Sequence, residues 1–338
     1  MTTSNTINIG LIGTGRIGKV HAEHLAYRIP NARLEAICDV NLSSAQECAA
    51  QFNVANVYDD AAPIFASEKI DAVVICSSTN THAPLIEQAA QANKHIFCEK
   101  PIDYDLARID NALKIVKQSG VKFMVGFNRR FDPNFLEVYR KITAGAIGDP
   151  HLLRITSRDP APPPIDYVKV SGGMFLDMTI HDFDMARYLV GSEITGVYAA
   201  GGVLVDPKIG EAGDIDTALI TLHFANGAIG AIDNSRKAVY GYDQRVEVFG
   251  SKGLISAENN TPTRTQISNT EGTHSPLPLH FFMDRYIDSY VEEMRQFIAS
   301  IVENTPPPVT GIDGRHPVAV GLAAQRSLKE ERLVSLDD

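Results

Sequence analysis

The chain has 338 residues, of which 44% are hydrophobic and 21% are charged, and its formal net charge is −10. This composition is ordinary for a globular protein, and the length is enough for two domains that each bury a core. The acidic excess argues against binding to nucleic acid or to an anionic membrane surface, and no uncharged run is long enough to cross a bilayer.

The chain has four cysteines: Cys38, Cys48, Cys76 and Cys98. They form no CxxC pair, and all except Cys48 lie in or beside apolar runs that are typical of buried strands. We therefore expect reduced, structural thiols rather than disulfides or metal ligands. No apolar segment of the kind found in export signals follows a basic start. Together these features lead us to expect a cytoplasmic protein.

The first third of the chain alternates short apolar runs with helical patterns. Expected strands are residues 7–13, 33–40, 70–78, 95–100 and 122–128, and expected helices are residues 16–29, 43–52 (with a Ser N-cap), 82–93 and 105–120. Apolar strands separated by helices of about ten to fifteen residues indicate a parallel sheet covered on both faces. Residues 1–128 are thus expected to form a doubly wound α/β domain.

After about residue 130 the pattern changes to strand-like alternation. Here we expect a helix over 133–145, strands within 151–159, 196–205, 216–239 and 244–258, a long helix over 284–304 and a closing helix over about 316–330. Asn226-Gly227 is a strong hairpin-turn signal. Residues 129–338 are expected to form an α+β domain with a largely antiparallel open sheet. The final helix of this domain is expected to pack either within it or on the first domain.

A glycine-rich turn follows the first expected strand and opens the first helix. It places Gly13, Gly15 and Gly18 in a GxGxxG pattern with Arg16 and Ile17 between them. In this context the glycines allow a tight turn, close approach of backbone to a pyrophosphate, and close helix–strand packing. The helix N-terminus then offers free N–H groups to phosphates, so the turn predicts a dinucleotide site.

Asp39 ends the second expected strand, about twenty residues past the glycines. A carboxylate there accepts hydrogen bonds from ribose hydroxyls and repels a 2′-phosphate, and no Arg occupies residues 40–42. The pattern favours NAD over NADP. At the end of the strand that begins at Ile70, four polar residues are candidates for the nicotinamide side of the site: Ser77, Thr79, Asn80 and His82.

Glu99 and Lys100 come directly after the fourth expected strand, and Pro101 favours an extended conformation at Lys100. A lysine at that edge of the sheet is suited to hydrogen-bonding a substrate hydroxyl, with Glu99 beside it near the cofactor. The residues alone leave a surface ion pair equally open.

Residues 172–189 read GGMFLDMTIHDFDMARYL, which predicts one helix. At about 100° per residue, its polar groups fall in one narrow band bounded by apolar ridges on both sides: Asp177, His181, Asp184 and Tyr188. A solvated face is not normally bounded in this way, so the row is expected to be buried or to line a cleft.

The solvent-facing side of the same helix is expected to carry Thr179, Asp182 and Ala186. Asp177 and His181 are four residues apart, so the carboxylate can orient the imidazole and raise its basicity. His181 is then a candidate general base that takes the proton of an alcohol while hydride leaves the same carbon.

A structural His–Asp pair and a metal site are the alternatives for this row. A metal would need further ligands, and the available histidines are not placed by any motif: His21, His24, His151 and His223. We expect no metal.

At this point the motifs resemble a known family, the Gfo/Idh/MocA oxidoreductases, and within it most closely the inositol dehydrogenase subset. The matching stretches span residues 9 to about 328 and include GLIGTGRIGKVHAEHL, EKPI, GFNRRFDPNF, SGGMFLDMTIHDFDMARYLVG, SRDPAPPP and YGYDQRVEVFG. The resemblance implies a Rossmann domain followed by an α+β domain for substrate binding and subunit pairing.

Residue by residue, Lys100 matches the family's catalytic lysine, and Asp177 and His181 match the Asp and His of its catalytic helix. Asp39 matches the acid that selects NAD. The resemblance further implies substrate-hydroxyl contacts at three positions: Arg130, Asp159 and Tyr240.

The implied activity is NAD-dependent oxidation of a cyclitol, with myo-inositol going to 2-keto-myo-inositol. The same fold acting on scyllo-inositol or an aldose sugar is the nearest alternative, and a non-enzymatic NAD-binding regulator or a lyase-like reaction with tightly held NAD are others. The resemblance also implies a homotetramer, or a homodimer, that pairs through the open sheet face.

Overall fold

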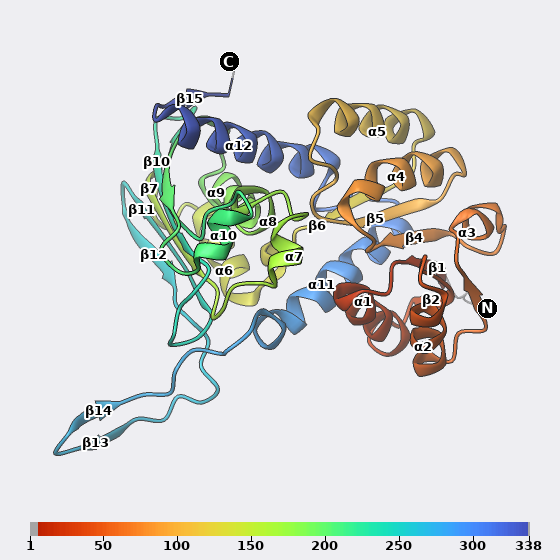
Figure 1. Cartoon of the computed structure of the whole chain (residues 1–338), viewed down its shortest axis with the longest axis horizontal. Helices are drawn as coiled ribbons and strands as arrows, with labels where there is room; N and C mark the ends of the chain where they lie inside the picture. Colours follow the sequence, from red (N-terminus) through yellow and green to blue (C-terminus); the bar gives the residue numbers. More distant parts are fainter. Residues whose placement is uncertain (1–5, 337–338) are drawn as a thin grey trace. The chain divides into compact units, whose positions relative to one another are not determined.

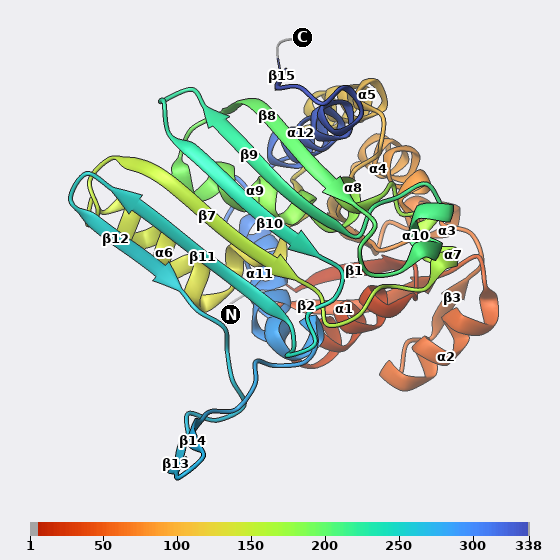
Figure 2. The same ribbon diagram turned by 60° about the vertical axis from the view of Figure 1, so that its left-hand side comes forward.

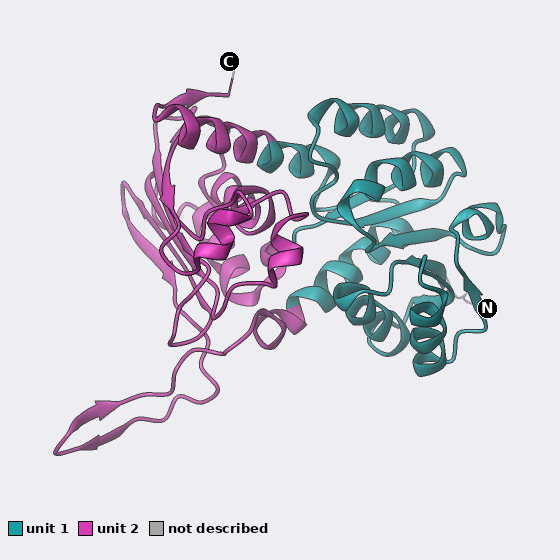
Figure 3. Cartoon of the chain, in the orientation of Figure 1, with its two compact units in different colours: residues 1–128, 289–318 teal, residues 129–288, 319–338 magenta. Residues whose placement is uncertain are grey.

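The computed structural model describes residues 6–336 and divides into two compact units (Figure 3). Unit 1 comprises residues 1–128 and 289–318, and unit 2 comprises residues 129–288 and 319–338. The first boundary between the units lies after residue 128. Segment 289–318 was assigned to the second domain from sequence, but it packs in unit 1.

Unit 1 contains a six-stranded sheet in the order β3-β2-β1-β4-β5-β6, with every neighbouring pair parallel (Figure 1). The strands are β1 (Ile7–Ile12), β2 (Ala32–Cys38), β3 (Asn56–Tyr58), β4 (Ala72–Ile75), β5 (His95–Glu99) and β6 (Phe123–Gly126). The strand order reverses between β1 and β4, and in such sheets ligands bind at the carboxyl ends beside that reversal.

Helices cover both faces of this sheet, with α1 and α2 on one side and α4 and α5 on the other (Figure 1). They are α1 (Arg16–Tyr27), α2 (Leu42–Phe52), α3 (Ala62–Ala66), η1 (Thr79–Thr81), α4 (His82–Gln91), α5 (Leu106–Ser119) and η2 (Asn128–Phe131), which crosses into unit 2. The short β3 and α3 were not predicted, and α2 takes Asn41 rather than a serine as its N-cap.

Two long helices pass from one unit to the other: α11 (Phe282–Val302) and α12 (Gly311–Glu330). In unit 1 the later part of α11 buries Phe297 against Phe97 of β5, with ring centroids 5.8 Å apart. The first turns of α12 also belong to unit 1. They pack closely there, since a Cβ added at Gly314 would lie only 2.7 Å from the Ile102 side chain. These apolar contacts account for the position of segment 289–318.

Unit 2 contains a seven-stranded sheet in the order β12-β11-β7-β10-β9-β8-β15 (Figure 2). Its strands are β7 (Pro150–Arg158), β8 (Ile194–Gly202), β9 (Thr217–Phe224), β10 (Ile229–Ser235), β11 (Asp243–Gly250), β12 (Gly253–Ala257) and β15 (Val334–Ser335). Among the described strand pairs of this seven-stranded sheet, only β7 and β10 are parallel. The predicted α/β class, with a doubly wound parallel sheet followed by a largely antiparallel one, is confirmed.

Helices pack on one face of this sheet and leave the other open (Figure 2). They are α6 (Pro133–Thr143), α7 (Ile165–Val168), α8 (Met174–Asp177), α9 (Ile180–Val190) and α10 (Pro207–Glu211). The Asn226-Gly227 hairpin forms as expected, with Gly227 at φ +86°. An unpredicted arm carries the two-stranded hairpin β13 (Ile267–Asn269) and β14 (Gly272–His274).

No helix in residues 6–336 combines the length and apolar character needed to cross a bilayer.

Candidate active site

The glycine-rich turn lies between β1 and α1 of unit 1, at the carboxyl edge of the parallel sheet. Gly13 has φ +98°, and a Cβ there would lie 2.6 Å from the Cys76 backbone. A Cβ at Gly18 would lie 2.0 Å from the Gly13 carbonyl oxygen, so helix and strand approach closely only because both residues are glycines. Gly15 has open space at its Cβ position.

This geometry fits a pyrophosphate. Open space at Gly15 lets a ligand reach the backbone, and the N-terminus of α1 presents N–H groups at the same place, near Arg16 and Ile17. Arg16 is exposed and Ile17 is half-buried. The turn therefore has the properties expected from its sequence.

Asp39 lies immediately after β2 and is held in place by the glycine-rich turn. Its Oδ2 accepts hydrogen bonds from the Thr14 N–H (2.7 Å) and hydroxyl (2.9 Å), and its Oδ1 accepts one from the Asn41 N–H (2.9 Å). Partial burial works to raise the pKa of Asp39, but these hydrogen bonds outweigh it and lower the pKa. Three of about four acceptor sites are thus used, which leaves one for a ribose hydroxyl.

The loop after β4 carries four predicted cofactor residues in different environments. Thr79 is half-buried and Asn80 is exposed, whereas the Ser77 hydroxyl shares a 2.7 Å hydrogen bond with that of Thr81. His82 is only 2% exposed. The first three remain candidates for contact with the cofactor.

His82 uses both ring nitrogens within unit 1. Its Nδ1 lies 2.7 Å from the Pro101 carbonyl oxygen, and its Nε2 lies 2.9 Å from the Ser77 carbonyl oxygen. Burial lowers the pKa of His82, although both carbonyls act to raise it. The imidazole links the loop after β4 to the turn that contains Lys100, and this geometry gives His82 a structural role in place of the predicted cofactor contact.

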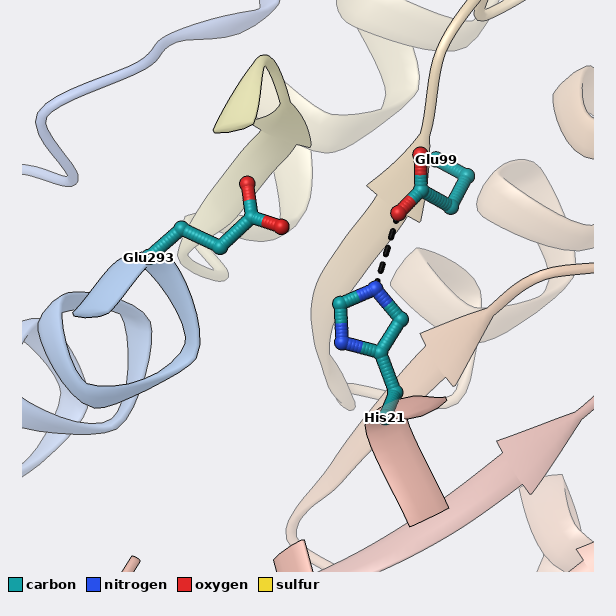
Figure 4. A group of neighbouring side chains, drawn as sticks. All are labelled: His21, Glu99 and Glu293. Carbon is teal, nitrogen blue, oxygen red and sulfur yellow. Dashed lines mark hydrogen bonds and ion pairs between the residues drawn. The ribbon is translucent and has the colours of Figure 1, made fainter. Parts of the chain in front are cut away.

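Lys100 follows β5 directly and is half-buried, at the same carboxyl edge as the glycine-rich turn. Its neighbour Glu99 lies inward, where its Oε1 is 2.8 Å from Nε2 of the buried His21 (Figure 4). A Cβ at Gly126 of β6 would lie 3.1 Å from the Glu99 carboxylate, so the glycine makes room for it. The backbone of the predicted catalytic lysine is therefore anchored on its N-terminal side.

In unit 2 the predicted single helix over 172–189 is interrupted. Helix α8 ends at Asp177 and α9 begins at Ile180, and the Thr179 N–H donates to the Met174 carbonyl, five residues back, at 3.0 Å. This wide turn changes the rotation between α8 and α9. The even spacing of 100° per residue used to place the polar row does not apply across it.

The residues expected to meet solvent are in fact buried. Thr179, Asp182 and Ala186 are each 0% exposed. Asp182 binds Nη1 of Arg129 at 2.5 Å and accepts from Asn234 Nδ2 at 2.9 Å. The prediction was wrong because partners from β10 and from the segment before α6 satisfy these polar groups inside unit 2.

Asp184 and Tyr188, the other end of the predicted polar row, are bound to Arg130. The Arg130 guanidinium makes a bidentate pair with the Asp184 carboxylate, with Nε–Oδ2 at 2.8 Å, and lies 4.8 Å from the Tyr188 ring centroid. Tyr188 stacks on Tyr139 of α6 at 3.9 Å. Arg130 is 6% exposed, so its geometry is that of a buried ion pair that fixes α9.

Asp177 and His181, at the start of the row, are both half-buried. The Asp177 carboxylate accepts from the Tyr167 hydroxyl at 2.8 Å and from Arg236 Nη1 at 3.3 Å. Arg236 is 1% exposed and also pairs with Asp214 Oδ2 at 3.4 Å. A buried guanidinium thus holds the predicted catalytic carboxylate in place.

Arg236 and Asp214 were missed by the sequence reasoning. Arg236 follows the apolar alternation of β10 directly, and Asp214 accepts from the Met174 N–H at 2.9 Å at the start of α8. A charged residue immediately after an apolar strand was the available signal for Arg236. No local pattern marked Asp214.

The parallel pairing of β7 and β10 brings their carboxyl ends together, with Arg158 opposite Ser235. Asp159 follows β7, and its N–H donates to the Ser235 carbonyl at 2.9 Å. Burial raises the pKa of Asp159 to about 6, which Arg236 opposes and Asp177 reinforces. Arg236 therefore lies among three carboxylates: Asp159, Asp177 and Asp214.

Tyr240 lies at the same end of the sheet. Its hydroxyl donates to Asp243 Oδ2 at 2.6 Å and accepts from Arg158 Nη1 at 3.0 Å. Arg158 in turn binds Asp233 at 2.6 Å. The edge presents fixed carboxylate, guanidinium and hydroxyl groups, which suit a ligand with several hydroxyls.

Replacing Asp159 by Asn is expected to remove a pH-dependent part of the free energy of unfolding. The pKa of Asp159 is about 6 in the folded chain against 3.8 unfolded, so its stabilising contribution is complete below about pH 4 and is lost as the pH rises through 6. As the pH rises from 4 to 7, the free energy of unfolding of Asp159→Asn should therefore increase relative to that of the wild type by up to about 2 kcal/mol. Urea unfolding at four pH values measures the difference.

The exposed Asp166→Asn serves as the control, because it removes a carboxylate from the same unit without burial. A difference between the wild type and Asp159→Asn that stays constant over this pH range would contradict the assignment.

Comparison with known families matches both parts of the chain. Residues 7–127 match the Gfo/Idh/MocA oxidoreductase family, NAD-binding Rossmann fold, and residues 135–256 match the GFO/IDH/MocA C-terminal domain. The chain belongs to this family of NAD-dependent oxidoreductases. The family, fold and cofactor expected from the sequence are confirmed.

Individual relatives are similar along the whole chain. Myo-inositol 2-dehydrogenase of Thermotoga maritima is 51% identical over 332 residues, which cover 98% of this chain and 99% of the relative. The crystal structure of a probable dehydrogenase from Thermotoga maritima matches with a TM-score of 0.96 at 51% identity, covering 98% and 99% of the two chains. Scyllo-inositol dehydrogenase from Lactobacillus casei, solved with bound NAD(H) and scyllo-inositol, matches at 0.93 with 32% identity and covers 98% and 100%.

Proposed function

We propose that the protein is an inositol 2-dehydrogenase, which oxidises myo-inositol to 2-keto-myo-inositol with NAD⁺. The observation that carries this proposal is the 51% identity with a myo-inositol 2-dehydrogenase over 98% of the chain. The retained acid–base residues Lys100, Asp177 and His181 support it. A polyol also matches the hydroxyl-binding character of the β7–β10 edge.

Bound NAD⁺ supplies the hydride acceptor. The Gly13–Gly18 turn and α1 hold its pyrophosphate, and Asp39 binds an adenosine ribose hydroxyl. Ser77, Thr79 and Asn80 are assigned to the nicotinamide side. These residues bind and orient the cofactor and take no part in proton transfer.

His181 acts as the general base that removes the proton from the reacting hydroxyl. The Asp177 carboxylate, held by Arg236, stabilises the imidazolium that forms. Lys100 hydrogen-bonds the reacting oxygen and stabilises its developing negative charge. Each of the three groups therefore favours the transition state of hydride removal.

Asp159 and Tyr240 are assigned to the other hydroxyls of the ring. Both side chains lie at the edge where β7 and β10 end, and carboxylate and phenol groups accept and donate hydrogen bonds to such hydroxyls. Arg130 is better assigned to holding Asp184 than to contacting substrate.

A substrate screen tests the function. Initial rates of NADH formation are measured with myo-, scyllo- and D-chiro-inositol, glucose and xylose, with and without a chelator. The proposal expects the highest kcat/KM for myo-inositol and no effect of the chelator. A higher value for scyllo-inositol or a sugar reassigns the substrate, and NAD⁺ binding without turnover favours a regulator.

The open face of the unit 2 sheet is proposed to pair copies of the chain. Large apolar side chains on alternate strand positions are exposed there: Leu152, Tyr198, Leu219, Ile229, Phe249 and Leu254. An apolar patch of this kind marks an interaction surface. We expect light scattering to give the mass of a tetramer or a dimer for the wild type. The double variant Leu219→Lys/Phe249→Lys should be a monomer. Unchanged assembly of the double variant would argue against this face.

We keep the cytoplasm as the proposed compartment. All four cysteines are free, three of them buried, which is compatible with a reducing environment. Cell fractionation tests this placement.

A further inference from the structure

Three titratable side chains meet in the interior of unit 1, next to the strand end that precedes Lys100. His21 lies on α1, Glu99 at the end of β5, and Glu293 on α11, and their carboxylate oxygens and ring nitrogen lie within 4.8 Å of one another (Figure 4). His21 and Glu293 are 0% exposed and Glu99 is 9% exposed. We name them the His21–Glu99–Glu293 cluster.

The surroundings of the cluster are apolar. The His21 ring packs edge-to-face on Phe97 (5.1 Å between centroids) and on Tyr290 (5.8 Å). Next to it, Gly126 leaves no side chain between β6 and the Glu99 carboxylate. Charges in such an environment are costly unless they are paired.

Glu99 has a partner, whereas Glu293 does not. Glu99 Oε1 is 2.8 Å from His21 Nε2, but neither Glu293 oxygen has a hydrogen-bond partner among the described residues. In Figure 4 the Glu293 carboxyl group points toward His21 and Glu99. Burial first, and then the nearby Glu99 charge, raise the pKa of Glu293 well above its usual range, and both causes favour the protonated, uncharged acid.

A metal ion is the competing occupant of this cluster. Two carboxylates and an imidazole are suitable ligands, but the described part of the chain brings no fourth His, Cys, Asp or Glu into the group. A closed structural zinc site takes four protein ligands. A neutral Glu293 removes the excess charge without any ion.

We propose that His21 and Glu293 are positioning residues for the dehydrogenase reaction, which hold Glu99 as a single buried anion and thereby fix the end of β5 from which Lys100 extends. The proposal rests on the proposed function. His21 donates to Glu99, and protonated Glu293 keeps a second negative charge away from it. Neither residue needs to touch substrate or cofactor for this role.

Three titratable groups near the cluster stay uncharged at pH 7 and so do not disturb this arrangement: Cys76, Cys98 and His24. Cys76 after β4 faces Glu293 and Glu99, Cys98 on β5 faces Glu99, and His24 on α1 and Tyr290 on α11 lie beside His21. Burial raises the pKa values of Cys76 and Cys98 well above the usual range, and burial with His21 lowers that of His24 to about 4. At alkaline pH, ionised Glu293 would repel Glu99 and loosen the strand end.

Three variants of helix α11 test the proposal. Glu293→Gln copies a neutral acid and is expected to keep kcat within about threefold at pH 7 while moving the alkaline limb of the kcat profile to higher pH. Glu293→Leu removes the polar group and is expected to lower kcat about tenfold or more with little change in the Kd for NAD⁺. Glu292→Gln, a half-buried residue paired with Arg295, is the matched control and should change neither.

The proposal is overturned if Glu293→Gln is as damaging as Glu293→Leu, or if its alkaline limb coincides with that of the wild type. It is also overturned if the wild type carries stoichiometric metal that Glu293→Gln loses. An infrared band of a protonated carboxyl group, absent from Glu293→Gln, reports the charge state without turnover.

If the wild type gives no NADH with any polyol, the proposed function fails separately. The rate of acylation of Lys100, followed by mass spectrometry, then decides the positioning role. Glu293→Leu should alter this rate at least about threefold, because the lysine loses its fixed position. An equal rate in wild type and Glu293→Leu would overturn the proposal.

Discussion

His181→Ala is expected to lower kcat for the NAD⁺-dependent oxidation of myo-inositol about a hundred-fold or more, and Lys100→Ala is expected to do the same. His181→Ala removes the base that accepts the hydroxyl proton. Lys100→Ala removes the cation that stabilises the developing negative charge on oxygen. Neither change should greatly weaken NAD⁺ binding, because neither side chain is assigned to the pyrophosphate or the ribose.

The measurement is steady-state kinetics at saturating NAD⁺ with myo-inositol and with its 2-deuterated form. Slower chemistry should raise the deuterium isotope effect on kcat toward its intrinsic value in both variants. The exposed residues His151 and Lys69 provide the matched controls His151→Ala and Lys69→Ala. A near-normal rate in either test variant would remove that residue from the mechanism.

Asp39 is expected to control the choice between NAD⁺ and NADP⁺. The wild type should prefer NAD⁺ by about a hundred-fold or more in kcat/KM, because a 2′-phosphate would face the Asp39 carboxylate, and like charges at contact cost several kcal/mol. The lowered pKa of Asp39 keeps the carboxylate charged well below neutral pH. The preference should therefore persist across the working pH range.

Asp39→Ser with Val40→Arg should reverse the preference, since Val40 is 94% exposed and an Arg there can pair with a phosphate. Asp59→Asn, an exposed carboxylate beyond β3, is the control for net charge. Equal kcat/KM values for the two cofactors in the wild type would show that Asp39 does not select between them. The double variant also loses the hydrogen bonds to Thr14, so its unfolding free energy is compared in parallel.

The short-range features of the site could be predicted from the sequence because their causes are local. Gly13 and Gly18 lie where only glycine fits, and Asp39 ends the second strand of a parallel sheet. The alternation of apolar strands and helices predicted the doubly wound unit 1. In unit 2, Asn226-Gly227 predicted the hairpin between β9 and β10. The EKP and Asp-x-x-x-His motifs then identified the family.

Other features depend on partners far away in sequence, and only the tertiary structure decided them. Asp182 was expected at the surface, but Arg129 and Asn234 hold it inside unit 2. His82 binds two backbone carbonyls, and Arg130 is taken up by Asp184.

The same holds for the surroundings of the catalytic residues. The position of the Asp177 carboxylate depends on Arg236, 59 residues later, and the anchoring of Glu99 depends on His21, 78 residues earlier. Periodicity along one segment reports which side chains share a face. It cannot report whether a distant cation or carbonyl will meet that face, and in a buried site this pairing determines both where a polar side chain lies and what charge it carries.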